Sequence, residues 1–302
     1  MWHFMDCGIF NQNHLLLKRS TIQLLRFPFS YFLMPVFWFA LSFVHEVNWA
    51  KAALIFFLLH ILLYPASNGY NSYMDRDEDS IGGIAKPLQP TRELFIVTVV
   101  MDIVAACLSF LVSAWFAAAF IVYIISSRLY SYRGIRLKQF PYIGYLVVVL
   151  NQGALTFFMV YHGAYQSATI DIPIILLLAA SFLIGGFYPI TQVYQHAADK
   201  RDGIRTISIV LGTRGTFIFC ALMYLAAFSL LFFYYRGQQQ FGSFLVLQLF
   251  FIPVLVYFIG WVIKVWHNSD AADFKHTMQM NWLASSCTSL AFITLFIIQQ
   301  FG

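Results

Sequence analysis

Residues 172–193 read IPIILLLAASFLIGGFYPITQV, and this stretch carries no charged side chain. A helix needs about 20 mostly apolar residues to cross the hydrocarbon core of a bilayer, so the stretch is long enough to cross once. The strands of a membrane barrel would instead be short segments of alternating polar and apolar residues. The stretch therefore predicts a transmembrane helix, whose backbone hydrogen bonds are satisfied within the segment.

Similar apolar runs recur along the whole chain, which has 302 residues, 60% of them hydrophobic and 10% charged. A soluble domain usually has about 25% charged residues. We predict an all-α, polytopic membrane protein with about nine transmembrane helices that form a single domain over residues 1–302. The predicted helices span residues 28–46, 52–70, 94–111, 113–127, 141–161, 172–193, 216–235, 243–263 and 280–299.

The lysines and arginines are distributed very unevenly over the loops between these helices. All 18 except Lys51 and Arg236 belong to the N-terminal segment and to the loops after the second, fourth, sixth and eighth helices. Cytoplasmic loops are enriched in Lys and Arg, so we expect the N-terminus and these four loops to face the cytoplasm. This orientation accounts for the net charge of +5, which therefore does not indicate a nucleic-acid partner.

Two segments that follow the second and sixth helices resemble one another. Residues 64–79 read YPASNGYNSYMDRDED and residues 188–203 read YPITQVYQHAADKRDG. Similarity at one fixed offset, four helices apart, predicts two parallel halves related by an axis along the membrane normal. We expect the halves to cover residues 28–138 and 141–263, followed by a final helix at 280–299. The matched pairs are Tyr64 and Tyr188, Pro65 and Pro189, Tyr70 and Tyr194, Asn71 and Gln195, Asp75 and Asp199, Arg76 and Lys200, and Glu78 and Asp202.

The first of these segments carries a regular row of oxygen-bearing side chains. Asn71, Asp75 and Asp79 are four residues apart, and each such step advances about 40° around a helix. We therefore expect these three side chains to form one stripe. Asp77 and Glu78 would then point elsewhere.

The second segment repeats this spacing at Gln195 and Asp199, with Asp202 close by. Two carboxylate stripes at one membrane mouth repel each other unless cations lie between them. Carboxylate and amide oxygens suit Mg²⁺, which binds through a few carboxylates and keeps positions open for phosphate oxygens. The two segments therefore predict a Mg²⁺ site that takes a diphosphate. The alternative is a pair of acidic loops that are merely solvated.

Residues 71–79, NSYMDRDED, resemble the first signature, NxxxDxxxD, of the UbiA superfamily of intramembrane prenyltransferases. The second signature of the family is commonly DxxxD followed by a glycine and a Thr-Leu-type tail, and it resembles Gln195, Asp199, Gly203, Arg205 and Thr206. Residues 130–138, YSYRGIRLK, are similar to the basic YS…LK segment of the family. The resemblance covers nearly the whole chain, and Gln195 departs from it because many members have an aspartate there.

The resemblance implies a Mg²⁺-dependent prenyltransferase that takes an isoprenoid diphosphate as donor and a lipid precursor, aromatic or other, as acceptor. The prenyl tail would enter between helices from the lipid, and the diphosphate would bind at the cytoplasmic mouth. The implied metal ligands are Asn71, Asp75 and Asp79 for one ion and Gln195, Asp199 and Asp202 for another, and all of them except Gln195 are expected to be catalytic. The implied diphosphate-binding residues are Gln195, Arg133, Lys138, Lys200 and Arg205.

Three other functions remain compatible with these patterns. A terpene cyclase would keep the metal site and cyclise the prenyl cation internally. A transporter also uses repeated halves, but its charged residues belong near the bilayer centre rather than at one mouth. A non-catalytic partner protein is the third, and the neutral Gln195 is the argument for it.

The remaining polar residues carry weaker signals. Asp102 lies inside the predicted helix 94–111, where a charge is costly, so it pairs with a buried partner, lines the cavity, lies near the interface or is protonated. The four cysteines show no metal or redox spacing; they are Cys7, Cys107, Cys220 and Cys287.

Overall fold

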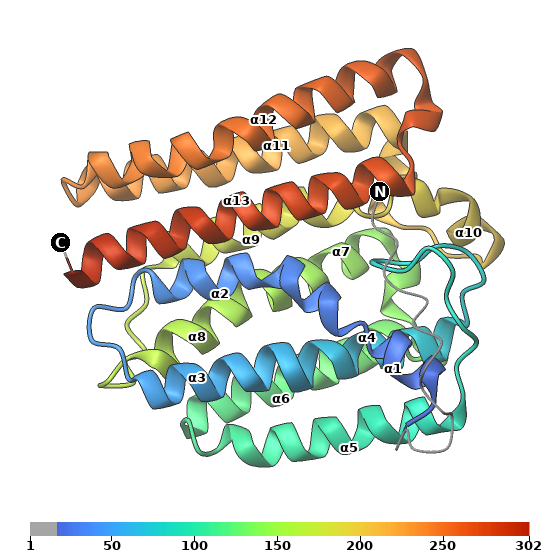
Figure 1. The fold of residues 1–302 in the computed structure, drawn as a ribbon, viewed down its shortest axis with the longest axis horizontal. Coiled ribbons are helices and arrows are strands. Elements are labelled where there is room, and N and C mark those ends of the chain that lie inside the picture. Colours follow the sequence, from blue (N-terminus) through green and yellow to red (C-terminus); the bar gives the residue numbers. More distant parts are fainter. Residues whose placement is uncertain (1–16, 302) are drawn as a thin grey trace, which may run out of the picture.

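The computed structural model describes residues 17–301, and within that range every regular element is a helix. The helices form nine successive rods that lie side by side, with the connecting loops at the two ends of the bundle (Figure 1). Cys7 lies outside the described residues.

Three of the nine rods are interrupted by a change of helix type. The first consists of α1 (Arg19–Leu25), the 3₁₀ helix η1 (Phe27–Leu33) and α2 (Met34–Leu41). The second consists of α3 (Trp49–Phe57), the π-helix η2 (Leu58–Leu63) and α4 (Tyr64–Asp75). The fifth follows the short η3 (Leu137–Gln139) and consists of α7 (Pro141–Val149), the π-helix η4 (Leu150–Leu155) and α8 (Thr156–Ala164).

The other rods are each one long helix, except that the seventh is kinked at Gly212, whose φ is 69°. The third and fourth are α5 (Arg92–Ser109) and α6 (Ala114–Ser131), and the sixth is α9 (Ile174–Ile190), which is followed by the short η5 (Val193–Gln195) and α10 (His196–Arg201). The last three are α11 (Ile207–Gly237), α12 (Phe241–His267) and α13 (Phe274–Phe301), with η6 (Ser269–Ala271) between α12 and α13.

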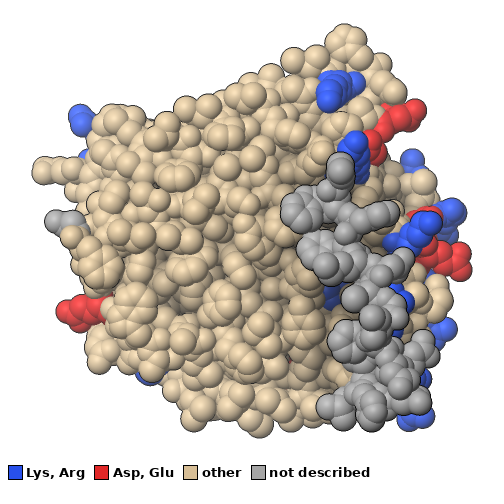
Figure 2. Space-filling model, viewed as in Figure 1, with Lys and Arg blue, Asp and Glu red and all other residues tan. Residues whose placement is uncertain are grey.

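Eight of these rods are long and apolar enough to cross a membrane. The remaining one is α5, which carries Arg92, Glu93 and Asp102 within its length. The face shown in Figure 2 has a broad uncharged band, and the charged side chains gather at the two ends of the rods. The prediction of an all-α, multi-pass integral membrane protein with about nine helices is confirmed.

The observed helix starts differ most from the prediction in the first and the seventh rods. The first rod begins at Arg19 and breaks at Arg26, whose φ of 50° is left-handed. Pro28 favours the break, because a proline has no N–H to donate to the carbonyl four residues earlier, that of Leu24, and its ring would clash with that carbonyl.

The seventh rod begins at Ile207, where the Thr206 hydroxyl accepts a hydrogen bond from the Ile209 amide at 3.4 Å and so satisfies a free amide of the first turn. A kink at Gly212, whose φ is 69°, separates this short start from the long part of α11, which corresponds to the predicted span 216–235.

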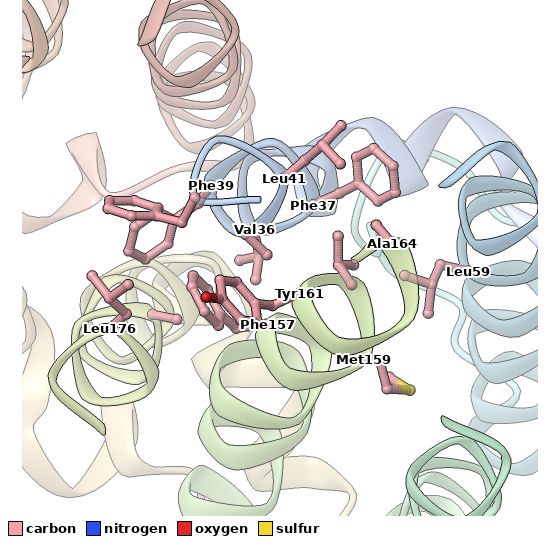
Figure 3. Packing of buried hydrophobic residues seen from close by; sticks show 14 of the residues in the cluster. Val36, Phe37, Phe39, Leu41, Leu59, Phe157, Met159, Tyr161, Ala164 and Leu176 are labelled. Carbon is pink, nitrogen blue, oxygen red and sulfur yellow. The ribbon is translucent and has the colours of Figure 1, made fainter. Parts of the chain in front are cut away.

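Aromatic packing holds α2 in the middle of the bundle, between α8 and α13. The ring of Phe39 on α2 lies 4.9 Å from that of Phe157 on α8 and 4.5 Å from that of Phe292 on α13. Figure 3 shows the side chains of α2 and α8 meeting in this core. The fifth rod also approaches α9 closely, because a Cβ at Gly153 would lie only 2.6 Å from the Cα of Ser181.

Asp102 forms a buried ion pair that joins α5 to α6. The Nε of Arg128 donates to Asp102 Oδ2 at 2.6 Å, and the same guanidinium lies 4.0 Å from the ring centroid of Tyr70. Arg128 therefore belongs to α6 rather than to the following loop. Of the alternatives for Asp102, the structure supports the buried partner, and this residue does not line either cavity of the described chain.

Candidate active site

A cavity of about 210 Å³ lies between the ends of α4, α6 and α9. In Figure 1 this is the end of the bundle that carries α1 and α10. Residues of both repeated segments line it, together with two basic residues: Asn71, Asp75 and Asp77 from the first segment, Gln195 and Asp199 from the second, and Arg26 and Lys138.

Asp75 is the best-defined acidic residue of this cavity. Its side chain is only 4% exposed, because the carboxylate accepts hydrogen bonds from two basic side chains. The Nζ of Lys138 donates to one carboxylate oxygen, and Arg136 Nη2 donates to the other at 3.3 Å. On the same helix, Asn71 Nδ2 donates to Ser131 Oγ at 2.9 Å, so the first segment is tied to the end of α6.

The expected stripe of three side chains is wrong beyond Asp75. The helix α4 ends at Asp75, and the chain turns away at Arg76, whose φ is 55°. Asp79 therefore lies outside the cavity, with 57% of its side chain exposed and paired with Arg201. The turn instead directs Asp77 into the cavity lining, where the helical spacing did not predict it.

The second segment also leaves its helix before the acids are reached. Pro189 lies near the end of α9, and the chain continues through η5 and α10. This break brings Gln195 and Asp199 to the cavity. Asp202 lies outside the lining and is 46% exposed, where Arg136 Nη2 donates to its Oδ2 at 3.3 Å.

Of the expected diphosphate-binding residues, only Lys138 and Gln195 line the cavity within the described chain. Arg133 instead binds the backbone at the end of α4, where its Nε donates to the Met74 carbonyl at 2.5 Å. Lys200 and Arg205 are exposed. Arg136, which belongs to the basic segment 130–138, joins the two repeated segments because it contacts both Asp75 and Asp202.

Arg26 is a basic residue that the sequence patterns did not single out. It is only 8% exposed and lines the cavity at the break between α1 and η1. Its Nη2 donates to the Asn68 carbonyl at 3.1 Å. The one available signal was the position of Arg26 two residues before Pro28, a residue that breaks a preceding helix because it cannot donate a backbone hydrogen bond.

The acidic groups of the cavity crowd one another. Burial raises the pKa of Asp77 to about 6, and the negative charge of Asp75 adds to the effect, while Lys138 and Arg26 oppose it. A raised carboxyl pKa means that the ionised form is destabilised. A cation bound between these groups would relieve that destabilisation.

The donors in the cavity fit Mg²⁺ held together with a diphosphate. Asn71, Asp75, Asp77, Gln195 and Asp199 all offer oxygen atoms, which hard cations prefer. In the described part of the chain, however, no three carboxylate, imidazole or thiol groups surround one point that could hold a metal ion. This arrangement suits Mg²⁺, because the ion usually binds through one or two carboxylates and completes its shell with water and phosphate oxygens.

A second, smaller cavity of about 40 Å³ adjoins the first. Phe32 of η1 and Phe187 of α9 line both cavities. The remaining walls of the second cavity come mainly from apolar side chains of α2, α9, α11 and α13: Pro35, Val36, Phe39, Leu183, Ile184, Tyr224, Ala284, Ser285 and Thr288. A polar mouth and an apolar compartment are thus separated by two aromatic rings.

Comparison with known proteins gives one family. The model of the UbiA prenyltransferase family matches residues 32–284. No match was found among curated protein sequences.

Solved structures of similar fold include UbiA homologs from Archaeoglobus fulgidus and Aeropyrum pernix K1. A UbiA homolog from Archaeoglobus fulgidus bound to GPP and Mg²⁺ aligns with a TM-score of 0.68 at 17% identity, over 92% of this chain and 99% of that one. The same homolog bound to DMAPP and Mg²⁺ gives 0.69 at 16% identity, with 92% and 99% covered. The apo structure of a homolog from Aeropyrum pernix K1 gives 0.66 at 16% identity, with 90% and 98% covered. At these identities the comparison shows a shared fold.

Proposed function

The chain belongs to the UbiA prenyltransferase family, and from that premise we propose that it transfers a prenyl group from an isoprenoid diphosphate to an acceptor in the membrane. One observation carries the proposal. Carboxylates from both repeated segments, Asp75 and Asp199, line the same cavity as the buried Lys138 and Arg26. A site that holds both signs of charge beside an apolar compartment matches a donor with a charged head and an apolar tail.

The diphosphate would lie at the polar mouth of the large cavity. Lys138 and Arg26 would neutralise part of its charge through hydrogen bonds, which are strong when donor and acceptor are both ionised. Mg²⁺ would be held in this cavity through one or two carboxylates at a time, drawn from Asp75, Asp77 and Asp199, and would supply Lewis-acid stabilisation of the leaving diphosphate. Asn71 and Gln195 add neutral oxygens to the same wall.

The prenyl tail would extend past Phe32 and Phe187 into the apolar compartment. Loss of the diphosphate leaves an allylic cation on the prenyl group, and the acceptor captures it. The faces of aromatic rings attract cations, and the large cavity offers Phe29, Phe32 and Tyr123 for this purpose. The buried walls also exclude water, which would otherwise compete with the acceptor.

Orientation forms part of the same proposal. The Lys and Arg excess lies at the end of the bundle that carries the cavity. By the positive-inside bias this end, and the N-terminus with it, faces the cytoplasm. The donor diphosphate would then bind from the cytoplasmic side.

The test is a product analysis with purified protein in lipid nanodiscs. Radiolabelled geranyl diphosphate and Mg²⁺ are added with a membrane lipid extract, and the labelled product is identified. We expect a prenylated lipid whose formation stops in EDTA and falls at least about a hundredfold in Asp199→Asn. Asp171→Asn, which neutralises an exposed acid outside the cavity, is the matched control. A cyclised hydrocarbon would support a terpene cyclase instead, and the absence of any metal-dependent product would contradict the proposal.

A further inference from the structure

Several polar atoms on the wall of the large cavity have no hydrogen-bond partner in the described part of the chain. They belong to Arg26 (Nε), Asn68 (Nδ2), Gln192 (Oε1) and Asn281 (Nδ2 and Oδ1). Asn281 is 0% exposed and Gln192 is 6% exposed. Arg26 interacts with the acidic end of the cavity through Asp77, whereas Gln192 and Asn281 are uncharged and come from other elements.

A buried amide without partners destabilises the ligand-free protein, because it has lost its hydrogen bonds to water and has gained none. An apolar side chain of similar size at position 281 would avoid this cost. The two amide atoms of Asn281 are therefore understandable if a group inside the cavity bonds to them when a ligand is present.

Gln192 and Asn281 are held by segments that pack together. Ile190 and Val193, on either side of Gln192, belong to the same hydrophobic cluster as Met280, which precedes Asn281. The Gln192 side chain is also oriented, because its Nε2 donates to the Tyr188 hydroxyl at 2.8 Å. The Oε1 of Gln192 is the atom that has no partner among the described residues.

Next to Asn281, α13 packs against η1 through a hydrogen bond and an aromatic contact. The hydroxyls of Tyr31 and Ser286 are hydrogen-bonded at 2.7 Å. The ring of Trp282, the residue after Asn281, lies 5.1 Å from that of Phe32. Phe32 lines both cavities, so Asn281 belongs to the part of the wall that continues toward the apolar compartment.

We propose that Asn281 and Gln192 form the acceptor-binding subsite, and that they take a neutral acceptor through a hydroxyl group. The inference rests on the proposed prenyl transfer and names the substrate class for it. A hydroxyl both donates and accepts one hydrogen bond, so it can satisfy an amide oxygen and an amide N–H together. A carboxylate only accepts hydrogen bonds, so it would leave the amide oxygens unpaired. Neither Asn281 nor Gln192 could supply a positive charge to balance that of the carboxylate.

The experiment measures binding, so that it does not depend on knowing the natural acceptor. Purified protein in nanodiscs is loaded with Mg²⁺ and geranyl S-thiolodiphosphate, an unreactive donor analogue. Calorimetry then compares 4-ethylphenol, 4-ethylanisole and 4-ethylbenzoate, with empty nanodiscs as the blank for partition into lipid. We expect the phenol to bind at least about tenfold more tightly than its methyl ether and than the carboxylate, an effect of one to two hydrogen bonds.

Two variants test whether Asn281 and Gln192 cause the preference for the phenol over its methyl ether. In Asn281→Leu and, separately, in Gln192→Leu the ratio between phenol and methyl ether should fall to within about twofold, while donor-analogue binding stays within about twofold of the parent. Gln248→Leu is the matched control, because Gln248 also has a buried amide atom without a partner but lines neither cavity. If one variant does not fold, the other carries the same test.

The outcomes separate the two proposals. A parent protein that binds the donor analogue but shows no preference for the phenol, or a preference that survives in both variants, would overturn the acceptor subsite alone. Tighter binding of 4-ethylbenzoate would do the same. A parent protein that shows no Mg²⁺-dependent binding of the donor analogue would overturn the proposed function itself.

Discussion

Neutralising Asp75 tests the centre of the proposed site. Asp75→Asn keeps the shape of the side chain and removes the charge that Lys138 and Arg136 contact. Two unit charges about 4 Å apart attract by about 4 kcal/mol at an effective dielectric constant of about 20, and breaking a buried ion pair on one side typically costs about 3–5 kcal/mol.

The net loss of stability should be smaller than these figures. Lys138 also interacts with the charges of Asp77 and Asp199, so its ammonium group keeps other anions nearby when Asp75 is neutral. We expect the free energy of unfolding to fall by about 2 kcal/mol. Turnover should fall much further, by at least about a hundredfold, which corresponds to about 2.7 kcal/mol of lost transition-state stabilisation.

The assay follows diphosphate release from geranyl diphosphate and the melting temperature of the same preparations. Each is measured with and without Mg²⁺ for the parent, Asp75→Asn and the exposed control Asp171→Asn. The melting temperature of Asp75→Asn should drop by several degrees, and added Mg²⁺ with donor should stabilise it less than the parent. If Asp75→Asn is as active and as stable as Asp171→Asn, the reasoning from the buried cluster is wrong.

Three further variants test other parts of the structure. Asp77→Asn should lower diphosphate release at least about tenfold, because Asp77 lines the cavity. Asp79→Asn should keep diphosphate release within about twofold of the parent, because its carboxylate is exposed. Equal activities of the two variants would refute the observed end of α4. Asn281→Leu should leave the melting temperature of the ligand-free protein unchanged or raise it, since it removes buried amide atoms without partners, and a fall of several degrees by scanning fluorimetry would show that the amide is structural. Gly153→Ala should destabilise the protein by about 1–3 kcal/mol, because the new Cβ would lie 2.6 Å from the backbone of α9. Gly260→Ala should leave stability unchanged, because nothing lies within 4 Å of its new Cβ. Thermal unfolding of both variants measures the difference, and equal stability would argue against the close contact between the fifth rod and α9.

The class of fold follows from local composition because a bilayer imposes one requirement on each segment separately. A run such as residues 172–193 must form a helix to satisfy its own backbone, whatever its neighbours do. The observed α9, Ile174–Ile190, accordingly lies within the predicted span. Even α5 follows this rule, although its Asp102 needed a partner on α6 that the sequence did not identify.

Part of the candidate site follows from helical spacing. Asn71 and Asp75 lie on one helix and both reach the cavity, as the four-residue step predicts. The prediction that Asp79 continues the helical stripe was wrong, because the four-residue step was carried past the point where Arg76 ends the helix. A left-handed residue at that point depends on the loop that follows, so the local pattern of polar residues does not reveal it. The two parallel halves and the catalytic role of these residues stay predictions.

What the sequence by itself determined is therefore the set of membrane helices and the residues that lie on one face of each. The tertiary structure alone decided which faces meet. Arg26 reaches the cavity because the first rod breaks there, and Asn281 reaches it because α13 packs against η1 and the end of α9. Contacts of this kind join residues more than two hundred positions apart, as Tyr31 and Ser286 show. Their proximity depends on how side chains of different helices interlock, and the spacing of residues along the chain carries no information about that.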